Sequence, residues 1–443
     1  MKRQSVVKIA SLATLGMVPM LFWSQDSQAI PAFARKYQTS CYTCHAGFPA
    51  RNAFGEAFKA NGYRWPGGED EDHAKQEQTK MGSDGWKKSF PSSPWPTDIP
   101  GFAPVAIFVT GPLFNYADEI KYKSGAKNGQ VKTGQVADWA GPFDARILYG
   151  GTIGSNIGFF GSFEGFAAGN NNKVSANNIV ARFRGTWTFT PGLMLSVGNQ
   201  FSFMSSGEDE ATWSAILPPS NGAGVELAYA TGEKSGGFRF YAGAVSNGTD
   251  QALNSSTTNG LDDIKYARAE FKIGGAGVLS GAGGTYGNEY IGLDNSLEIG
   301  ASVVNALPGI FSSSSYGYKN NRTVYGVDIA GNYGSFTGGA AWSRGVDNDL
   351  NNYQVDAGYF VYPWLKAAVT YKSVETWGSD GVHAGNSNIT NPTYTFTVTA
   401  WPRANVSFAA AYVLFEKGNN PVADANGIFN NANTFKFTTA LAF

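Results

Sequence analysis

Residues 177–190 read NNIVARFRGTWTFT, and alternate positions of this stretch differ in chemistry. The apolar positions are Ile179, Ala181, Phe183, Trp187 and Phe189. The polar positions between them are Arg182, Arg184, Thr186 and Thr188. Because successive side chains of a strand point to opposite faces, the alternation predicts a strand with one apolar and one polar face.

The same alternation recurs along the chain and predicts about 16 antiparallel strands, an even number as in bacterial single-chain barrels. They are expected at 102–113, 143–151, 155–167, 177–190, 193–204, 223–232, 237–247, 264–274, 277–287, 322–333, 335–344, 352–361, 364–375, 391–401, 405–415 and 434–443. Residues 295–304 also alternate, which would lead towards 18 strands. We assign them instead to one long loop, 288–321.

A soluble β-sandwich alternates too, but two features favour a membrane barrel. Aromatic residues lie near predicted strand ends, as in interfacial girdles. They are Trp187, Phe189, Tyr359, Trp364 and Trp401. The chain also ends FKFTTALAF, which is similar to the last strand of bacterial outer-membrane barrels. We therefore expect an all-β transmembrane barrel in the outer membrane, in contact with lipid.

Composition and connection lengths agree with this fold. The chain has 56 glycines, 14% aromatic and 15% charged residues, and a net charge of −1. There is no basic patch of the kind that binds nucleic acid. Short and long connections alternate, and in such barrels the short ones are periplasmic and the long ones extracellular. Both ends of the barrel then fall on the periplasmic side.

The N-terminus predicts an exported protein. Lys2, Arg3 and Lys8 precede an apolar run at 9–23, and Ser27-Gln28-Ala29 offers a cleavage site. This is the pattern of a signal peptide over residues 1–29. The run is shorter than the ~20 residues that a membrane-anchoring helix needs.

The only two cysteines stand in Cys41-Tyr42-Thr43-Cys44-His45. This spacing is the attachment signature of a c-type haem. It predicts one covalently bound haem c, with thioether links to Cys41 and Cys44 and with His45 as the proximal iron ligand. A thioredoxin-like dithiol would require a βαβ surround, which this sequence lacks; a structural disulfide is the other alternative.

Residues 30–101 therefore form a haem segment and linker ahead of a barrel at 102–443. Pro49 is expected to open a short helix that Asn61-Gly62 closes, with Phe54 and Phe58 on one face. A second helical stretch is expected near 72–80. The segment holds too little apolar material for a free-standing domain. We therefore expect the haem to lie inside the barrel and to use its interior as part of the pocket.

The sixth ligand of the iron has few candidates. His73 follows His45 by 28 residues and is preferred over Met81. A methionine ligand would raise the reduction potential relative to a second histidine. His383 is expected in an extracellular loop, and Met194 and Met204 share the lumenal face of one predicted strand.

The haem segment resembles the fused outer-membrane monohaem cytochrome–porin family of iron-oxidising bacteria. The resemblance is carried by Phe33-Ala34-Arg35 through His45, Phe48-Pro49, Phe54-Gly55, Phe58-Lys59 and Asn61-Gly62-Tyr63. It implies that Cys41, Cys44 and His45 hold the haem. It also implies that the protein oxidises extracellular iron(II) and passes electrons to a periplasmic c-type cytochrome or copper protein. The chain departs from the family at Tyr37-Gln38 and at Glu56.

Three other functions stay open: an outward electron-transfer reductase, a nutrient porin with a structural haem plug, and a soluble periplasmic haem enzyme. An iron site at the outer mouth would use hard oxygen ligands. Acidic candidates in the predicted outer loops are Glu208, Asp209, Glu210, Asp347 and Asp349. No catalytic residue is assigned.

Overall fold

The computed structural model describes most of the chain from residue 32 onward. The described residues are 32–48, 50–67, 70–75, 78–79, 88, 99–100, 104–122, 131–136, 144–164, 180–199, 201, 222–246, 263–280, 287–288, 291–307, 322–347, 350–378, 387–403, 405–415, 428–429 and 433–442. The predicted signal peptide, residues 1–29, lies outside them.

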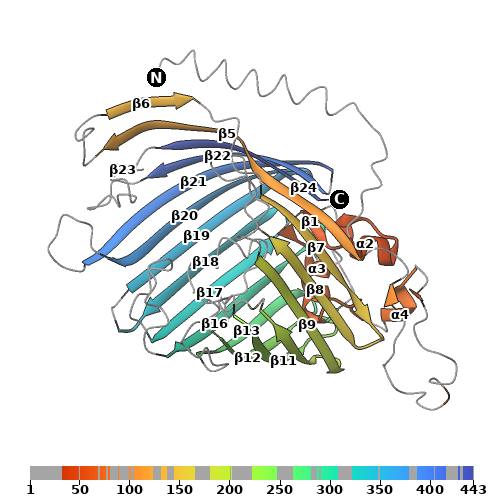
Figure 1. Cartoon of the computed structure of the whole chain (residues 1–443). Helices are drawn as coiled ribbons and strands as arrows, with labels where there is room; N and C mark the ends of the chain where they lie inside the picture. The colour runs from red at the N-terminus through yellow and green to blue at the C-terminus, as the bar shows by residue number, and fades with distance from the viewer. Residues whose placement is uncertain are drawn as a thin grey trace.

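Sixteen long strands form one closed antiparallel barrel (Figure 1). They are β5 (Val105–Tyr122), β7 (Asp144–Ile153), β8 (Ile157–Glu164), β9 (Val180–Thr190), β10 (Leu193–Gly198), β11 (Gly224–Thr231), β12 (Ser235–Val245), β13 (Ile264–Ala276), β16 (Ser296–Ala306), β17 (Thr323–Tyr333), β18 (Phe336–Gly345), β19 (Leu350–Tyr362), β20 (Leu365–Gly378), β21 (Ser387–Arg403), β22 (Val406–Phe415) and β24 (Thr434–Ala442). β24 pairs with β5, which closes the ring. Two short strands, β6 (Val131–Val136) and β23 (Ile428–Phe429), pair with the outer half of β5. The predicted count of about 16 is confirmed.

One predicted strand is wrong. β16 (Ser296–Ala306), which falls within the predicted loop 288–321, pairs with β13 and β17 and takes the place expected for 277–287. The described residues 277–280 lie in a turn after β13. Both stretches alternate, but β16 presents large outward side chains, such as Leu297 and Ile299, whereas 277–287 is mostly glycine, alanine and serine. The connection from β13 to β16 carries two short paired strands, β14 (Gly287–Asn288) and β15 (Leu293–Asp294).

The outside of the barrel is apolar. Many large hydrophobic side chains remain exposed on it, and they sit on the predicted outward face of each strand; examples are Phe183, Leu227, Phe271, Ile299, Val327, Val355 and Phe396. A surface of this kind is suited to lipid. Described connections of two or three residues join β7 to β8, β9 to β10, β11 to β12, β17 to β18 and β19 to β20, and they gather at one end, which we call the short-turn mouth. The opposite end is the long-loop mouth.

Aromatic pairs surround the short-turn mouth on the outside. The ring centres of Trp187 and Phe189 lie 5.0 Å apart, and Tyr362 stacks on Trp364 with ring centres 5.5 Å apart. The placement of Trp401 in this girdle is wrong, because its side chain faces inward and is buried. Trp401 is an even number of residues from the alternating threonines of β21 and therefore lies on the same, inward face of that strand.

The N-terminal residues between 32 and 75, hereafter the plug, lie at the short-turn mouth, with helix α3 inside the ring of strands (Figure 1). The plug comprises α2 (Ala32–Tyr37), the 3₁₀ turn η2 (Cys41–Thr43), β1 (His45–Gly47), β2 (Ala50–Arg51), α3 (Ala53–Ala60) and α4 (Asp70–His73). Beyond the plug, β3 (Gln78–Thr79) pairs with β4 (Ile99–Pro100).

The predicted start of the plug helix is wrong, and its predicted end is confirmed. α3 begins after Asn52, whose side chain accepts a hydrogen bond from the Gly55 amide, and ends before Asn61. Asn52 is a stronger N-cap than a proline three residues earlier, because its oxygen satisfies a helix amide that has no partner within the helix. α4 is also earlier and shorter than the helix expected near 72–80.

A glycine of the wall allows the plug to pack closely. A Cβ atom at Gly158 of β8 would meet the Gly62 carbonyl oxygen at 1.8 Å. Gly158→Ala should therefore force the plug away from the wall, at a cost of about 1–3 kcal/mol. We expect faster proteolysis of the plug and a larger single-channel conductance in a planar bilayer. Gly185→Ala, on the next strand, is the control, because a Cβ there meets side chains and no backbone: the Phe183 ring edge at 3.1 Å and Val197 Cγ2 at 4.0 Å. Equal behaviour of the two variants would contradict this packing.

Candidate functional site

A buried ion-pair network fastens the plug to the wall. Lys36 of α2 pairs with Asp70 of α4 and donates to Thr152 Oγ1 of β7 at 2.5 Å. Asp70 Oδ1 also accepts from the Tyr37 hydroxyl at 2.6 Å and from the Trp65 amide at 2.8 Å. Lys36 and Asp70 are each 1% exposed. An ion pair this deeply buried needs such additional hydrogen bonds to offset the loss of hydration.

A second set of contacts holds another part of the plug. The Trp401 indole Nε1 donates to the Phe48 carbonyl at 3.0 Å. Ala46 packs into a buried cluster with the side chains of Ile291, Leu293, Phe360 and Trp401. The connection from β13 to β16 therefore reaches into the short-turn mouth and packs against the plug. The sequence gives no signal that Lys36 or Asp70 would hold the plug. For Trp401 the one signal is its position on the inward-facing side of its strand.

The structure brings both cysteines onto one turn. The Cys44 amide donates to the Cys41 carbonyl at 3.2 Å, and the Ser40 hydroxyl caps the turn by accepting from the Tyr42 amide. Side chains three residues apart are eclipsed in a 3₁₀ turn, so the two thiols project on the same side. Neither forms a disulfide. Tyr42, between them, is 47% exposed, so the turn borders open space.

The thiols are not set up as nucleophiles. Burial, with the nearby Cys41, raises the pKa of Cys44 to about 12, and burial also raises the pKa of Cys41. Catalytic dithiols have lowered pKa values, because the thiolate is the reactive species. This argues against the thioredoxin-like reading of the two cysteines.

His45 follows the turn on β1, with its ring oriented by the backbone. Its Nδ1 lies 3.3 Å from the Ala50 carbonyl oxygen, which can only accept a hydrogen bond. With Nδ1 as the donor, the neutral ring carries its lone pair on Nε2. The ring packs edge-on against Phe48 at 5.1 Å, and Phe48 against Phe108 of β5 at 5.2 Å.

An aromatic cluster surrounds Cys44 and extends to His73. Tyr37, Phe54 and Phe58 form its buried centre, and Cys44 and Trp65 pack against them. His73 stacks on Trp65, with ring centres 4.7 Å apart and planes at 13°. Stacking leaves the ring edge of a histidine available for an in-plane ligand bond. Phe54 and Phe58 share one face as predicted.

Other predicted positions fall elsewhere. Met194 faces inward on β10 and lines a cavity beside the plug. Asp347 Oδ2 accepts from the Arg322 amide at 2.6 Å and so serves its own loop. The remaining candidates lie outside the described residues: Met81, Met204, Glu208, Asp209, Glu210, Asp349 and His383. Within the described part of the chain, no cluster of three or more His, Cys, Asp or Glu suits a metal ion.

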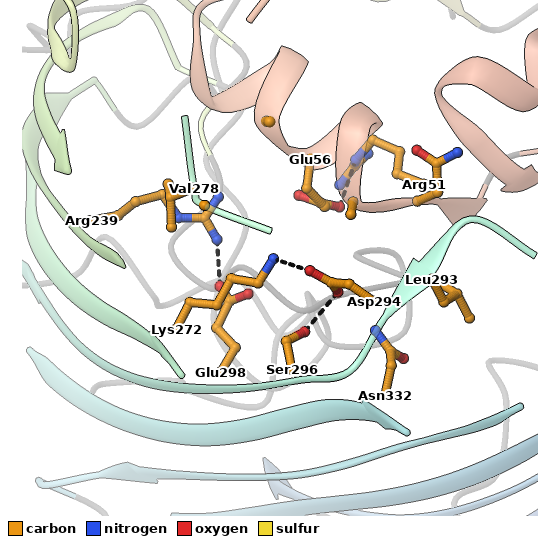
Figure 2. Close-up of a pocket in the computed structure, with 14 residues that line it drawn as sticks. Arg51, Glu56, Arg239, Lys272, Val278, Leu293, Asp294, Ser296, Glu298 and Asn332 are labelled. Carbon is orange, nitrogen blue, oxygen red and sulfur yellow. Dashed lines mark hydrogen bonds and ion pairs between the residues drawn. The ribbon is translucent and has the colours of Figure 1, made fainter. Parts of the chain in front are cut away.

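Two small polar cavities separate α3 from the wall. The first, of about 50 Å³, lies between Arg51 and Glu56 of the plug and Arg239, Lys272 and Glu298 of the wall (Figure 2). Arg51 and Glu56 pair at 2.8 Å. These cavities have room for a few water molecules and not for a porphyrin.

The second cavity, of about 80 Å³, is bordered by Lys59 of the plug and by Arg184 and Glu226 of the wall. Burial, with the positive charges of Arg51, Arg184 and Arg239, lowers the pKa of Lys59 to about 7. The polar face of α3 thus meets a charged wall.

Comparisons with known proteins concern the barrel. No family model and no curated protein matches the chain. Among solved structures, an anion-selective porin from Comamonas acidovorans has a TM-score of 0.44 at 12% identity, covering 76% of this chain and 99% of its own. A mutant of the Rh. blastica porin has a TM-score of 0.42 at 11% identity over 76% and 99%. A loop-deletion mutant of OmpT, an outer membrane protein of Vibrio cholerae, has 0.40 at 12% over 77% and 100%. In the described residues, no helix has the length and apolarity to cross a bilayer.

The Lys36–Asp70 pair makes the docking of the plug on the wall weaker at acid pH. Burial alone would raise the pKa of Asp70, but Lys36 and the hydrogen bonds from Tyr37 and Trp65 lower it below its ordinary value. A carboxyl with a lowered pKa stabilises above its ordinary pKa, and this stability is lost as pH falls through the folded value. Protection of the plug from protease should therefore fall below about pH 4.

Asp70→Asn should weaken docking by about 3 kcal/mol at neutral pH, since Lys36 loses its counter-charge, and should flatten the acid dependence. Asp72→Asn is the matched control, because Asp72 is on the same helix and exposed. If Asp70→Asn keeps the acid transition, the ion pair is not its origin.

Proposed function

We propose that this protein is an outer-membrane electron conduit. It carries one haem c on Cys41 and Cys44, takes electrons from extracellular iron(II) and passes them to a periplasmic c-type cytochrome or copper protein. One observation carries the proposal: two thiols on one side of a single turn, followed directly by His45, at the mouth of a closed barrel. The apolar exterior, together with a folded segment that packs inside the short-turn mouth, supports a membrane protein that is more than a diffusion channel.

The residues present fit a haem. The eclipsed thiols match two vinyl groups on one edge of the ring, and both are unbonded. The His45 ring, held through Nδ1 by Ala50, has the tautomer that binds iron through Nε2. The aromatic cluster beside Cys44 offers an apolar wall, and the exposed side at Tyr42 leaves room for the group.

When bound, the haem would supply reversible one-electron exchange between iron(II) and iron(III). In each turnover one extracellular iron(II) becomes iron(III), and one periplasmic acceptor is reduced. The chain contributes orientation and insulation. Ala50 fixes the His45 ring, the ion pair of Lys36 with Asp70 fixes the plug, and the barrel wall separates the site from lipid.

The position of the turn bears on the route. Phe48, whose ring packs against His45, contacts the wall near the ends of β5 and β21, at the short-turn mouth. The long-loop mouth lies at the far end of β21, a strand of 17 residues. A donor from outside must therefore enter the lumen to approach the haem, while a periplasmic acceptor approaches at the short-turn mouth.

Replacing both attachment thiols tests the haem. Cys41→Ser with Cys44→Ser should remove haem staining from the denatured band and abolish reduction by iron(II) added outside reconstituted vesicles. Thr43→Ser, in the same turn, is the control and should keep both signals. A double variant that retains its haem stain would refute the attachment.

Direction is tested with the intact protein in vesicles. Excess iron(II) outside should reduce the haem, and a periplasmic-side acceptor should then re-oxidise it. A haem that stays oxidised under iron(II), yet is re-oxidised by external iron(III) after reduction from the short-turn side, would instead support an outward reductase. A haem inert to both would support a porin with a structural plug.

The sixth ligand is expected from the segment after the haem motif, with His73 preferred over Met81. His73 is held against Trp65, within the cluster that packs around Cys44. His73→Ala should change the visible spectrum and the reduction potential. An unchanged spectrum in His73→Ala, together with a changed one in Met81→Ala, would assign the ligand to Met81.

A further inference from the structure

The charges on one wall of the lumen neutralise one another. Arg268 of β13, with no side-chain exposure, binds Asp328 Oδ2 and Glu270 Oε1, both at 2.6 Å. Its guanidinium crosses Gly300, where a Cβ would come within 2.1 Å of Nη2. Two further pairs on this wall are Arg184 with Glu226 and Arg239 with Glu298. The wall from β9 to β17 therefore presents little net charge to the lumen.

The wall from β20 to β24 is different. In its described residues the inward-facing charges are Lys366, Lys372 and Lys436, with no carboxylate among them. The strand register shows that these side chains face inward. Lys372 lies opposite the buried Gln354 of β19. Lys436 lies opposite Ala411 of β22, which in turn lies opposite Thr397 of β21. The neighbouring inward carboxylate is Asp356 on β19.

Lys372 and Lys436 keep their positive charge available to the lumen. Within the described residues neither Lys372 nor Lys436 forms an ion pair. Lys366 lies over the Phe360 ring at 5.3 Å. A positive charge without a counter-charge raises the local concentration of anions and lowers that of cations.

A row of hydroxyl groups runs between the lysines. Its members alternate along the inward face of β21 and are partly exposed: Thr393, Thr395, Thr397 and Thr399. The Thr393 hydroxyl donates to the Lys372 carbonyl at 3.4 Å, so the row offers donors chiefly through the other three. Hydroxyl and ammonium groups both donate hydrogen bonds, which is the chemistry that an anion requires as it loses part of its hydration. The wall thus combines positive charge with donors along its length.

We propose that the lumen admits small anions in preference to cations along the wall formed by β20, β21, β22 and β24. On the proposed function, iron would then reach the interior as an anionic complex, such as a chelate with carboxylate ligands, and not as the aqua cation. The first statement concerns the lumen alone and holds whether or not the chain carries haem.

Charged thiol reagents test the lumen without any need for haem. Thr395→Cys in the full-length protein places a thiol between Lys372 and Lys436. Its modification rate is measured with a methanethiosulfonate reagent that bears a sulfonate and with one that bears a trimethylammonium group, both added at the long-loop side. The parent protein gives the background from Cys41 and Cys44, and the rate ratio on a small free thiol gives the reference.

The anionic reagent should be favoured several-fold over that reference. Lys372→Gln and Lys436→Gln should each lower the ratio about fourfold, since each removes about a twofold gain for the anion and a twofold loss for the cation. Lys234→Gln, in the exposed turn between β11 and β12, makes the same change in net charge and should have no effect. Folding of each variant is checked by heat-modifiable gel mobility. A ratio equal to the reference, a preference for the cation, or no response to either lysine change would overturn the proposal.

The iron complex is tested separately. Haem reduction should be faster with an anionic iron(II)–citrate or iron(II)–EDTA complex than with a cationic complex of similar potential, and Lys372→Gln should reduce the difference. The cationic complex could react as fast while the Thr395→Cys thiol still prefers the anionic reagent. That result would refute the statement that iron enters as an anionic complex, and the anion preference of the lumen would stand. Absence of any haem signal would refute the proposed function and leave the thiol result unaffected.

Discussion

A ring of sixteen strands is too wide for its own side chains to fill. This constraint explains most of the molecule. Closure from β24 to β5 satisfies every edge of the sheet, but it leaves an interior that needs water, a folded segment or both. Here the N-terminal plug occupies the short-turn mouth, and the wall around it carries matching features: Thr152 for Lys36, Gly158 for Gly62 and Trp401 for Phe48.

The barrel could be predicted from sequence because alternation is a local property. In a strand such as β9, eleven residues are enough to distinguish the apolar face from the polar face, without knowledge of the neighbouring strands. The choice between 277–287 and 295–304 was not local, since both alternate and only pairing with β13 and β17 selects β16. The start of α3 is a related case: Pro49 suits a first helical position, but the Asn52 side chain caps the helix three residues later.

The Cys41–His45 motif is also local, and its spacing alone predicts the haem attachment that we propose. What surrounds it is not. Lys36 meets Thr152 across 116 positions, and Phe48 meets Trp401 across 353. No pattern near the motif identifies such partners, because they are chosen by the curvature of a closed sheet. The best local indication is the face of the strand on which a residue lies. An aromatic residue such as Trp401 on the polar, inward face predicts an apolar contact inside the barrel.

These separations also set an order of folding. The plug gains its contacts with Gly292 only after the connection to β16 exists, and those with Phe360 and Trp401 only after β19 and β21 are in the wall. Contacts so distant in sequence form late, because the chain between them must first be ordered. The plug, which precedes the barrel in the chain, is thus expected to dock among the last parts of the structure.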